Sequence, residues 1–288
     1  FVRHHDVFLK AKNEELLASL QPDLLITLGD SFISKNLKLF IRKHSPTRHW
    51  HIKATEQLID TFQTLTTQIP VKPTYFFQKL LEDLDYQQFV HNDGDDDGRG
   101  EYRQAWLHAD RLAKRNLTQF LRHETRWNEF ALVDKLLEKL PENSVLHLAN
   151  SMPVRYVNLL GLNQSAEVFA NRGTSGIDGC TSTAVGAALA TQKLVFLLTG
   201  DVAFFYDRNA LWHPHLPQNL RIVLFNNGGG NIFRLIDGPA AQPELEQYFE
   251  TRHQTTARHT AEDAGLDYFV VGTDTNHGEE QNFESIWS

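Results

Sequence analysis

Two apolar runs in the second half of the chain each end on small or polar residues, and this pattern constrains the fold most. Residues 194–199 lead into Gly200 and Asp201, and residues 222–225 lead into an asparagine pair at 226 and 227. Each run has the length and the β-branched or aromatic content of a strand buried in a parallel sheet. Because open α/β sheets bind ligands at the carboxyl ends of their strands, the pattern predicts a polar site at one sheet edge.

The two strand ends offer a particular set of ligand atoms. Asp201 supplies a carboxylate, Asn227 supplies a carboxamide, and the loops around them supply backbone carbonyls. Hard oxygen atoms suit Mg²⁺, which keeps few protein ligands and takes the others from water and a bound phosphate. We therefore expect a magnesium site that holds a phosphate-containing ligand.

The rest of the chain repeats the alternation of strands and helices. A length of 288 residues is enough for two domains. We expect an α/β fold with two doubly wound, Rossmann-like parallel-sheet domains, the first over residues 1–115 and the second over residues 116–288. The spacing of apolar residues predicts strands at 24–28, 49–52, 145–148, 167–169, 194–199, 221–225 and 268–271, and helices near 7–20, 35–43, 101–115, 126–140, 152–160, 179–192, 203–211, 242–250 and 256–265.

Charge and cysteine content narrow the class of protein. The formal charge of −8 argues against nucleic acid or an anionic membrane surface as a partner. The single cysteine, Cys180, excludes an internal disulfide framework and fits a reducing compartment. No apolar run approaches the ~20 residues of a membrane-spanning helix, and no apolar stretch of a signal peptide follows Phe1. We therefore expect a cytoplasmic protein that binds no membrane.

A glycine-rich loop at residues 171–179 leads into a helix of small residues. Its three glycines allow the backbone to approach a ligand closely. A tight strand-to-helix connection explains the glycines but not Arg172 or Ile177. A nicotinamide dinucleotide site is the natural competitor. However, the glycine spacing differs from the G-x-G-x-x-G motif of such sites. A nicotinamide dinucleotide site would also leave the polar residues Asp201 and Asn227 without a role.

An acidic segment has some of the spacing of a calcium-binding loop. Asp93, Asp95, Asp97 and Gly98 match its first four conserved positions, but Gln104 stands where the loop needs a bidentate glutamate. A solvated linker is the favoured interpretation of this segment, and calcium is the alternative.

Four segments together resemble the thiamine diphosphate enzymes. Asp201 and Asn227 match the metal–diphosphate motif of that superfamily, with Val202 where many members have glycine. The chain is most similar to the MenD family, the 2-succinyl-5-enolpyruvyl-6-hydroxy-3-cyclohexene-1-carboxylate synthases of menaquinone biosynthesis. The most specific segment is Asn-Arg-Gly-Thr-Ser-Gly-Ile-Asp-Gly. The segments that carry the resemblance are 29–35, 150–155, 171–179 and 226–233.

The resemblance implies a role for each matching residue. Asp201, the Asn227 side chain and the Gly229 carbonyl would hold Mg²⁺, for which Mn²⁺ can substitute, against the cofactor diphosphate beside Gly200. The other implied roles are cofactor seating by Ser151, Ser175 and Gly176, bending of the cofactor by Ile177, carboxylate binding by Arg155, Arg172 and Lys35, and pocket lining by Phe233.

The resemblance also implies the reaction, which is decarboxylation of 2-oxoglutarate and addition of the succinyl-semialdehyde unit to isochorismate. Both substrates are dicarboxylates, and guanidinium groups bind carboxylates through paired hydrogen bonds. The arginines at 155 and 172 are consistent with this chemistry in an otherwise acidic chain.

The family has three domains, and this chain matches the central one, shortened at its start, and the diphosphate-binding one. The glutamate that activates the cofactor belongs to the pyrimidine-binding domain, which the partner subunit contributes. Because no residue here matches it and the chain begins on Phe1, we expect a piece of a longer protein. The whole protein should form a homodimer or homotetramer, and this chain alone should have no synthase activity. Two alternatives stay open: an acetolactate-synthase-like carboligase, and a non-catalytic cofactor-binding module.

Overall fold

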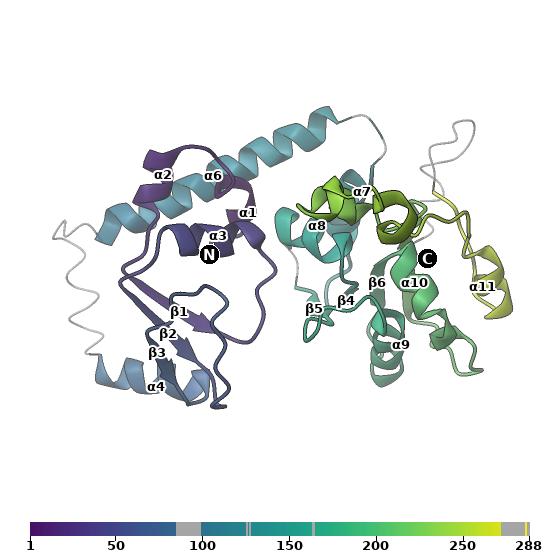
Figure 1. The fold of residues 1–288 in the computed structure, drawn as a ribbon. Coiled ribbons are helices and arrows are strands. Elements are labelled where there is room, and N and C mark those ends of the chain that lie inside the picture. The colour runs from purple at the N-terminus through teal and green to yellow at the C-terminus, as the bar shows by residue number, and fades with distance from the viewer. Residues whose placement is uncertain (85–98, 125, 127, 163–164, 272–285, 287–288) are drawn as a thin grey trace. The chain divides into compact units, whose positions relative to one another are not determined.

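The computed structural model describes residues 1–84, 99–124, 126, 128–162, 165–271 and 286. They form two compact units (Figure 1). The first unit comprises Phe1–His123 and Asn158–Gly161, and the second comprises Glu124–Val157 and Leu162–Ser288. The acidic segment with the calcium-like spacing lies largely outside the described residues. The predicted domain boundary at 115/116 falls inside helix α6 (Arg99–His123).

The first unit is built on a three-stranded parallel sheet. Its strands are β1 (Leu24–Leu28), β2 (Arg48–Ile52) and β3 (Thr67–Ile69), and β2 lies in the middle. The register places Leu24 opposite Arg48 and Trp50 opposite Thr67. The helices of this unit are α1 (His5–Phe8), α2 (Glu14–Ser19), α3 (Lys35–Lys43), α4 (Pro73–Asp83) and α6.

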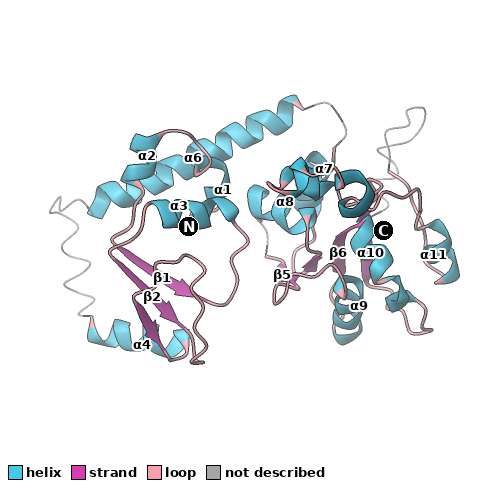
Figure 2. Ribbon diagram, viewed as in Figure 1, coloured by secondary structure: helices cyan, strands magenta, loops and turns pink. Residues whose placement is uncertain are grey.

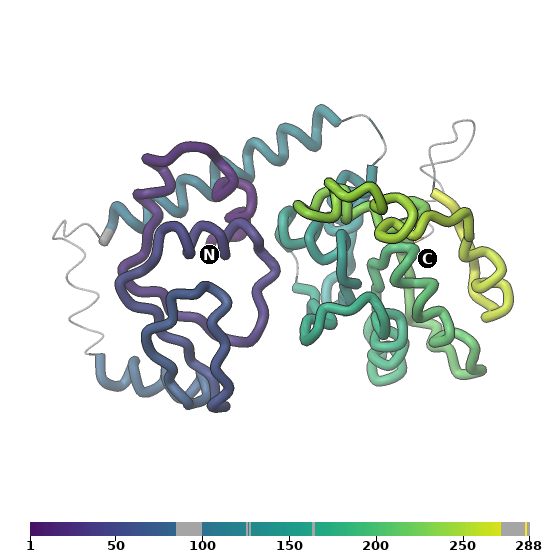
Figure 3. The backbone as a smooth tube through the Cα atoms, in the orientation of Figure 1, coloured from purple at the N-terminus to yellow at the C-terminus, as the bar shows by residue number. Residues whose placement is uncertain are grey.

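The N-terminal segment packs along α6, although the two are far apart in the sequence (Figure 3). The backbone N–H groups of Arg3 and His4 donate to Asp110 Oδ1 at 2.9 and 2.7 Å. The Trp106 ring lies edge-on to Phe8, with a centroid distance of 5.6 Å. These contacts close the apolar core of the first unit, whose buried members are Phe8, Leu9, Leu17, Leu20, Phe40, Ile41, Phe62, Ala109 and Ala113.

The second unit is built on a four-stranded parallel sheet in the order β5-β4-β6-β7. The strands are β4 (Val145–Leu148), β5 (Glu167–Ala170), β6 (Val195–Gly200) and β7 (Leu220–Phe225). The chain leaves β4 towards β5 and leaves β6 towards β7, in opposite directions along the sheet. The carboxyl ends of β4 and β6 therefore form a topological switch point, where open α/β sheets bind their ligands.

Helices and short helical turns surround this sheet (Figure 2). The helix α9 (Cys180–Ala190) lies against β6 and buries Ala184, Val185 and Ala188, and the small alanine side chains allow close packing. The α-helices are α7 (Glu129–Lys139), α8 (Met152–Leu160), α9 (Cys180–Ala190), α10 (Asp201–Tyr206) and α11 (Arg258–Asp263). The turns are η1 (Arg208–Leu211), η2 (Asn231–Leu235), η3 (Pro239–Ala241) and η4 (Leu245–Phe249).

The predicted fold class, α/β with two doubly wound parallel-sheet units, is confirmed, but four local predictions are wrong. The helix near 203–211 is divided at Asp207 into α10 and the 3-10 turn η1. The helix near 7–20 is two helices, because Asn13 accepts a hydrogen bond from Leu16 N (3.0 Å) and caps a new helix. The helix near 242–250 is the single π-helical turn η4, since Pro243 lacks the N–H group that a longer helix needs. Residues 268–271 form no strand, and the Tyr268 ring instead packs under Arg258 of α11 at 5.0 Å.

The helices that the structure describes include none with the length and apolar character needed to cross a lipid bilayer.

Candidate functional site

The loops after all four strands of the second sheet carry residues that the sequence predicts to be functional. Ser151 follows β4, the glycine-rich loop 171–179 follows β5, Asp201 follows β6, and residues 226–229 follow β7. Because the strands are parallel, these four loops emerge at the same edge of the sheet. The structure thus brings most of the predicted residues to the switch point.

Asp201 is the buried centre of this edge. Its side chain is at the start of α10, and the residue is only 2% exposed. Its Oδ2 accepts hydrogen bonds from the backbone N–H groups of Gly228 (2.7 Å) and Gly229 (3.0 Å). Its Oδ1 accepts one from Val202 N at 2.7 Å. The carboxylate therefore fixes the loop after β7 to the end of β6.

The glycines of the β7 loop are required by its backbone. Gly228 and Gly229 have φ angles of 80° and 150°, which side chains with a Cβ rarely adopt. A Cβ on Gly229 would also lie 2.6 Å from the carbonyl oxygen of Glu250. Gly230 N donates to that same carbonyl at 2.6 Å. Only glycine lets the loop lie between Asp201 and the segment around residue 250.

The oxygen atoms around Asp201 fit a magnesium ion. A carboxylate has about four acceptor positions, and backbone N–H groups take three of those on Asp201. The Asn227 amide donates its Nδ2 to Glu129 Oε1 (2.7 Å), which leaves the amide oxygen for another partner. The Gly229 carbonyl accepts one hydrogen bond, from Asn231 N at 3.0 Å, and has a second lone pair. One carboxylate, one amide and one carbonyl oxygen are a donor set of the kind that Mg²⁺ binds.

His253 faces the same carboxylate. Its Nδ1 accepts the N–H of Thr255 at 3.1 Å, so neutral His253 carries its proton on Nε2. That Nε2 is buried, forms no hydrogen bond with a described residue, and lies 3.2 Å from Asp201 Oδ2. A cavity of about 460 Å³ beside it is lined by Asn227, Gly228, Asn231, Arg252, His253 and Gln254. An unsatisfied N–H donor and an arginine at this cavity suit an anion such as a diphosphate.

Asn150 holds the glycine-rich loop in place. The residue is 2% exposed, and its Nδ2 donates to the carbonyls of Asn171 (2.8 Å) and Gly176 (2.6 Å). Within this loop Ser175 has a positive φ of 60°, a left-handed conformation stabilised by its surroundings. Ile177 is half-buried and packs on the apolar cluster of Ala149, Cys180 and Ala203. Asn150 therefore fixes the loop at two of its carbonyl groups.

Two arginines lie together at the start of α8 and in the glycine-rich loop. Arg155 Nη1 donates to the carbonyl of Ser151 at 2.5 Å, and Ser151 itself has a φ of 77°. Arg172 Nη1 donates to Asn150 Oδ1 at 2.6 Å, while its Nε is buried without an acceptor among the described residues. Burial lowers the pKa of Arg155, and the nearby charge of Arg172 lowers it further.

An anion would accept a hydrogen bond from the buried Arg172 Nε and would offset the repulsion between the two arginines. A carboxylate binds guanidinium groups through paired hydrogen bonds and would neutralise the repulsion. The geometry of Arg155 and Arg172 is therefore suited to a carboxylate ligand.

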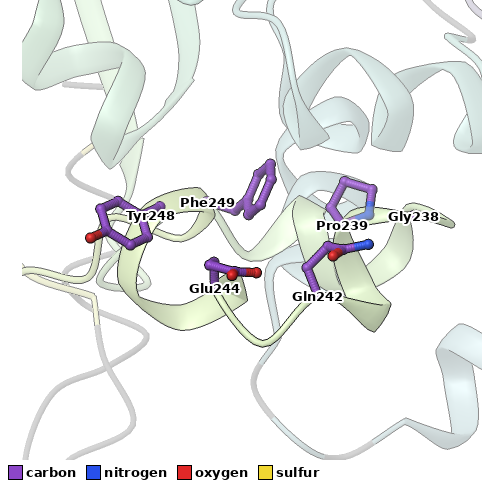
Figure 4. Close-up of a pocket in the computed structure, with 6 residues that line it drawn as sticks. All are labelled: Gly238, Pro239, Gln242, Glu244, Tyr248 and Phe249. Carbon is purple, nitrogen blue, oxygen red and sulfur yellow. The ribbon is translucent and has the colours of Figure 1, made fainter.

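Phe233 lies in the turn η2 and contacts Phe249, with a centroid distance of 5.5 Å. Phe249 also borders a second cavity of about 560 Å³ between η3 and η4, shown in Figure 4. Gly238, Pro239, Gln242, Glu244, Tyr248 and Phe249 line it, and none of these six is cationic. This cavity therefore lacks the charge that a dicarboxylate would require.

Two further predicted residues occupy defined positions. Gly200 is the last residue of β6 and precedes the first turn of α10. Lys35 begins α3 in the first unit and is exposed there. Its role at a substrate site stays a prediction.

Comparison with known proteins identifies the family. The family described as "Middle domain of thiamine pyrophosphate" matches residues 2–148. The chain belongs to this family. The match covers the first unit apart from Phe1 and Asn158–Gly161, and it extends to the end of β4.

Several proteins similar to this chain share one printed name, 2-succinyl-5-enolpyruvyl-6-hydroxy-3-cyclohexene-1-carboxylate synthase. The one from Cytophaga hutchinsonii is 45% identical over 269 residues, which are 93% of this chain and 46% of the relative. The one from Flavobacterium johnsoniae is 39% identical over the same shares of each chain. The one from Bacteroides fragilis is 38% identical over 271 residues, 94% of this chain and 46% of the relative. The chain thus spans about half the length of the curated relatives it matches.

Three residues of this thiamine pyrophosphate family member join the site without being predicted. Asn150 follows an apolar run as Asp201 does, so the sequence held a signal for it. Glu129 contacts Asn227 from a helix start 98 positions away in the sequence, and an acidic residue is ordinary there. His253 lies in a loop without periodicity. The spacing of residues in the sequence therefore gives no signal for Glu129 or His253.

An ion-pair network around the buried Glu250 lies next to the loop after β7. Glu250 is 0% exposed, and its carboxylate accepts hydrogen bonds from Arg252 Nε (2.8 Å) and Arg234 Nη2 (3.1 Å). Both arginines also donate to Glu246 Oε1, at 2.9 and 3.0 Å. Burial alone raises the pKa of Glu250, but the hydrogen bonds from Arg252 and Arg234 outweigh it and hold this pKa below its ordinary value.

The substitution Glu250→Gln should lower the melting temperature, and the loss should depend on pH. Because the folded-state pKa is depressed, the ionised carboxylate stabilises the fold above its ordinary pKa of 4.5. That stabilisation is lost as the pH falls through the lower folded-state pKa. Melting curves from pH 7 to pH 3 should show the gap between the two proteins narrowing below about pH 4.5. A gap that stays constant over this range would contradict the ionised network.

Proposed function

We propose that this chain is the cofactor-binding half of a thiamine diphosphate- and Mg²⁺-dependent 2-succinyl-5-enolpyruvyl-6-hydroxy-3-cyclohexene-1-carboxylate synthase. The complete enzyme would decarboxylate 2-oxoglutarate and add the remaining four-carbon unit to isochorismate in menaquinone biosynthesis. The observation that carries the proposal is the Asp201 carboxylate bound to Gly228 N and Gly229 N. This contact joins the end of β6 to the loop that carries Asn227 and Gly229, the other two proposed metal ligands. The names of the relatives support the choice of reaction.

The diphosphate end of the cofactor would be held at the switch point. Asp201, Asn227 and the Gly229 carbonyl would bind Mg²⁺, which neutralises the diphosphate. The buried Nε2–H of His253 lies at the same position and offers a hydrogen bond to a phosphate oxygen. Ser151, Ser175 and Gly176 would seat the remainder of the cofactor, with Ile177 beneath its ring.

The substrates would bind beside the cofactor. Arg155 and Arg172 would hold a carboxylate of each dicarboxylate, since the unused Arg172 Nε–H needs an acceptor. Phe233 would line the pocket. Bound thiamine diphosphate supplies the carbon nucleophile for decarboxylation and carbon–carbon bond formation, which no side chain of the protein can supply. The protein would contribute orientation and charge.

We further propose that the complete protein is longer than this chain. The relatives are about twice its length, and the glutamate that activates the cofactor would belong to the part that this chain does not match. The complete enzyme would be a cytoplasmic homodimer or homotetramer with the cofactor between subunits.

A product assay tests the function. The complete enzyme, supplied with Mg²⁺, thiamine diphosphate, isochorismate and either 2-oxoglutarate or pyruvate, should consume 2-oxoglutarate and release CO₂ at least about 100-fold faster than with pyruvate, given the two lost charge-assisted hydrogen bonds. The 288-residue chain alone should show no turnover. Faster reaction with pyruvate would indicate an acetolactate-synthase-like carboligase instead. Turnover by this chain alone would show that the activating residue lies within it.

A further inference from the structure

Glu129 joins two parts of the second unit that carry different predicted functions. The residue begins α7, where Asn128 caps the helix by accepting a hydrogen bond from Ala131 N at 2.9 Å. One carboxylate oxygen, Oε1, accepts the Asn227 Nδ2–H at 2.7 Å. The other, Oε2, accepts the hydroxyl of Tyr156 at 3.0 Å. Glu129 thus bridges the loop after β7 and the helix α8.

The contact with Asn227 decides which way its amide faces. An ionised carboxylate only accepts hydrogen bonds, so the group that faces Glu129 must be the NH₂ end of the amide. The amide oxygen, which is the atom that a metal ion binds, is then directed away from Glu129. Without Glu129 the amide could rotate by half a turn and present its NH₂ group to the cation.

The contact with Tyr156 holds Glu129 itself. Burial and the neighbouring negative charge of Glu129 raise the pKa of Tyr156, so its hydroxyl stays protonated and donates. The Phe130 ring lies 5.7 Å from the Tyr156 ring and limits its movement. The carboxylate is therefore held at both oxygens, one by α8 and one by the β7 loop.

We propose that Glu129 is a positioning residue that orients the Asn227 amide for metal binding. The proposal rests on the proposed function, since it requires Asn227 to be a ligand of Mg²⁺. Residues that hydrogen bond to a metal ligand fix its orientation, and their loss typically weakens metal binding by about 10–100-fold. Because Tyr156 follows Arg155 in α8, the same carboxylate also ties the metal loop to the helix that carries a carboxylate-binding arginine.

Manganese binding to the complete enzyme tests this role directly. Mn²⁺ substitutes for Mg²⁺ at oxygen sites, and its free and bound forms are distinguished by electron paramagnetic resonance. In the presence of thiamine diphosphate, Glu129→Ala should raise the Mn²⁺ dissociation constant by about 10-fold or more. Glu129→Asp keeps the charge but is one methylene shorter, so it should weaken binding similarly while preserving the fold.

Two matched variants separate orientation from charge. Glu129→Gln removes the charge, but its amide oxygen can still accept the Asn227 N–H, so it should bind Mn²⁺ nearly as well as the unsubstituted enzyme. Tyr156→Phe keeps the Glu129–Asn227 contact and should also retain most of the affinity. Melting temperatures of all variants show whether a lost affinity reflects a lost fold.

The outcomes distinguish this inference from the proposed function. No Mn²⁺ binding by the unsubstituted enzyme would overturn the metal site and the role of Glu129 together. Binding that is lost in Asp201→Ala but unchanged in Glu129→Ala and Glu129→Asp would overturn the role of Glu129 alone. Equal losses in Glu129→Gln and Glu129→Ala would also overturn it, because charge rather than orientation would then explain the effect.

Discussion

The substitution Asp201→Ala should abolish Mg²⁺-dependent binding of thiamine diphosphate, the largest effect expected of any single change in this chain. It removes the one carboxylate of the proposed metal site, and it also releases the loop that carries the other two ligands. Gly228 N and Gly229 N lose their shared acceptor, to which they donate at 2.7 and 3.0 Å. Each unsatisfied buried donor costs about 1–3 kcal/mol, so the loop should move and the chain should be less stable.

Calorimetric titration of the cofactor in the presence of Mg²⁺ measures this loss. Asp201→Asn is the informative companion, because it keeps the shape of the side chain and one acceptor oxygen but removes the charge. Asp263→Asn, at the exposed end of α11, is a control for a change of charge away from the site. Unchanged affinity in Asp201→Ala would remove Asp201 from the metal site.

The substitution Gly229→Ala should have the second-largest effect, on both stability and metal binding. The glycine has a φ of 150°, and a Cβ there would meet the Glu250 carbonyl at 2.6 Å. The backbone strain alone costs about 1–3 kcal/mol, and relief of the clash would displace the Gly229 carbonyl that is a proposed ligand. We expect a lower melting temperature together with weaker Mn²⁺ binding, measured on the same sample.

Gly186→Ala is the matched control for this change. Gly186 lies inside α9, and no atom other than those of its neighbouring helical backbone lies within 4 Å of the position that its Cβ would occupy. Alanine is favoured over glycine inside a helix by about 1 kcal/mol, so this variant should be as stable as the original chain or slightly more so. Equal stability of the two alanine variants would contradict the strained geometry of Gly229.

The edge of the second sheet could be predicted because strands buried in a parallel sheet have a clear sequence pattern. The strands predicted at 194–199 and 221–225 match β6 and β7 within one residue at each end. Parallel strands place their carboxyl ends at one edge, so polar residues that directly follow such runs must lie close together. The hydrogen bonds of Asp201 to the β7 loop follow from this rule.

The features that the sequence did not predict depend on contacts between distant residues, which local sequence patterns do not contain. Three residues of β3 carry too little apolar signal to predict a strand. The apolar residues 268–271 resemble a strand in sequence, but they form none, and Tyr268 instead contacts Arg258 of α11. Glu129 orients Asn227 across 98 positions of sequence, and only the folded chain brings them within 2.7 Å. Side chains that support a site from another element are therefore the least predictable from sequence.

The central claim is that this chain binds thiamine diphosphate through a metal ion at the ends of β6 and β7. Calorimetric titration of thiamine diphosphate into the complete enzyme, once with Mg²⁺ and once with a chelator, tests it most directly. The geometry of Asp201, Asn227 and Gly229 predicts heat of binding with Mg²⁺ and none with the chelator. Equal binding under both conditions, or no binding at millimolar Mg²⁺ and cofactor, would contradict the claim.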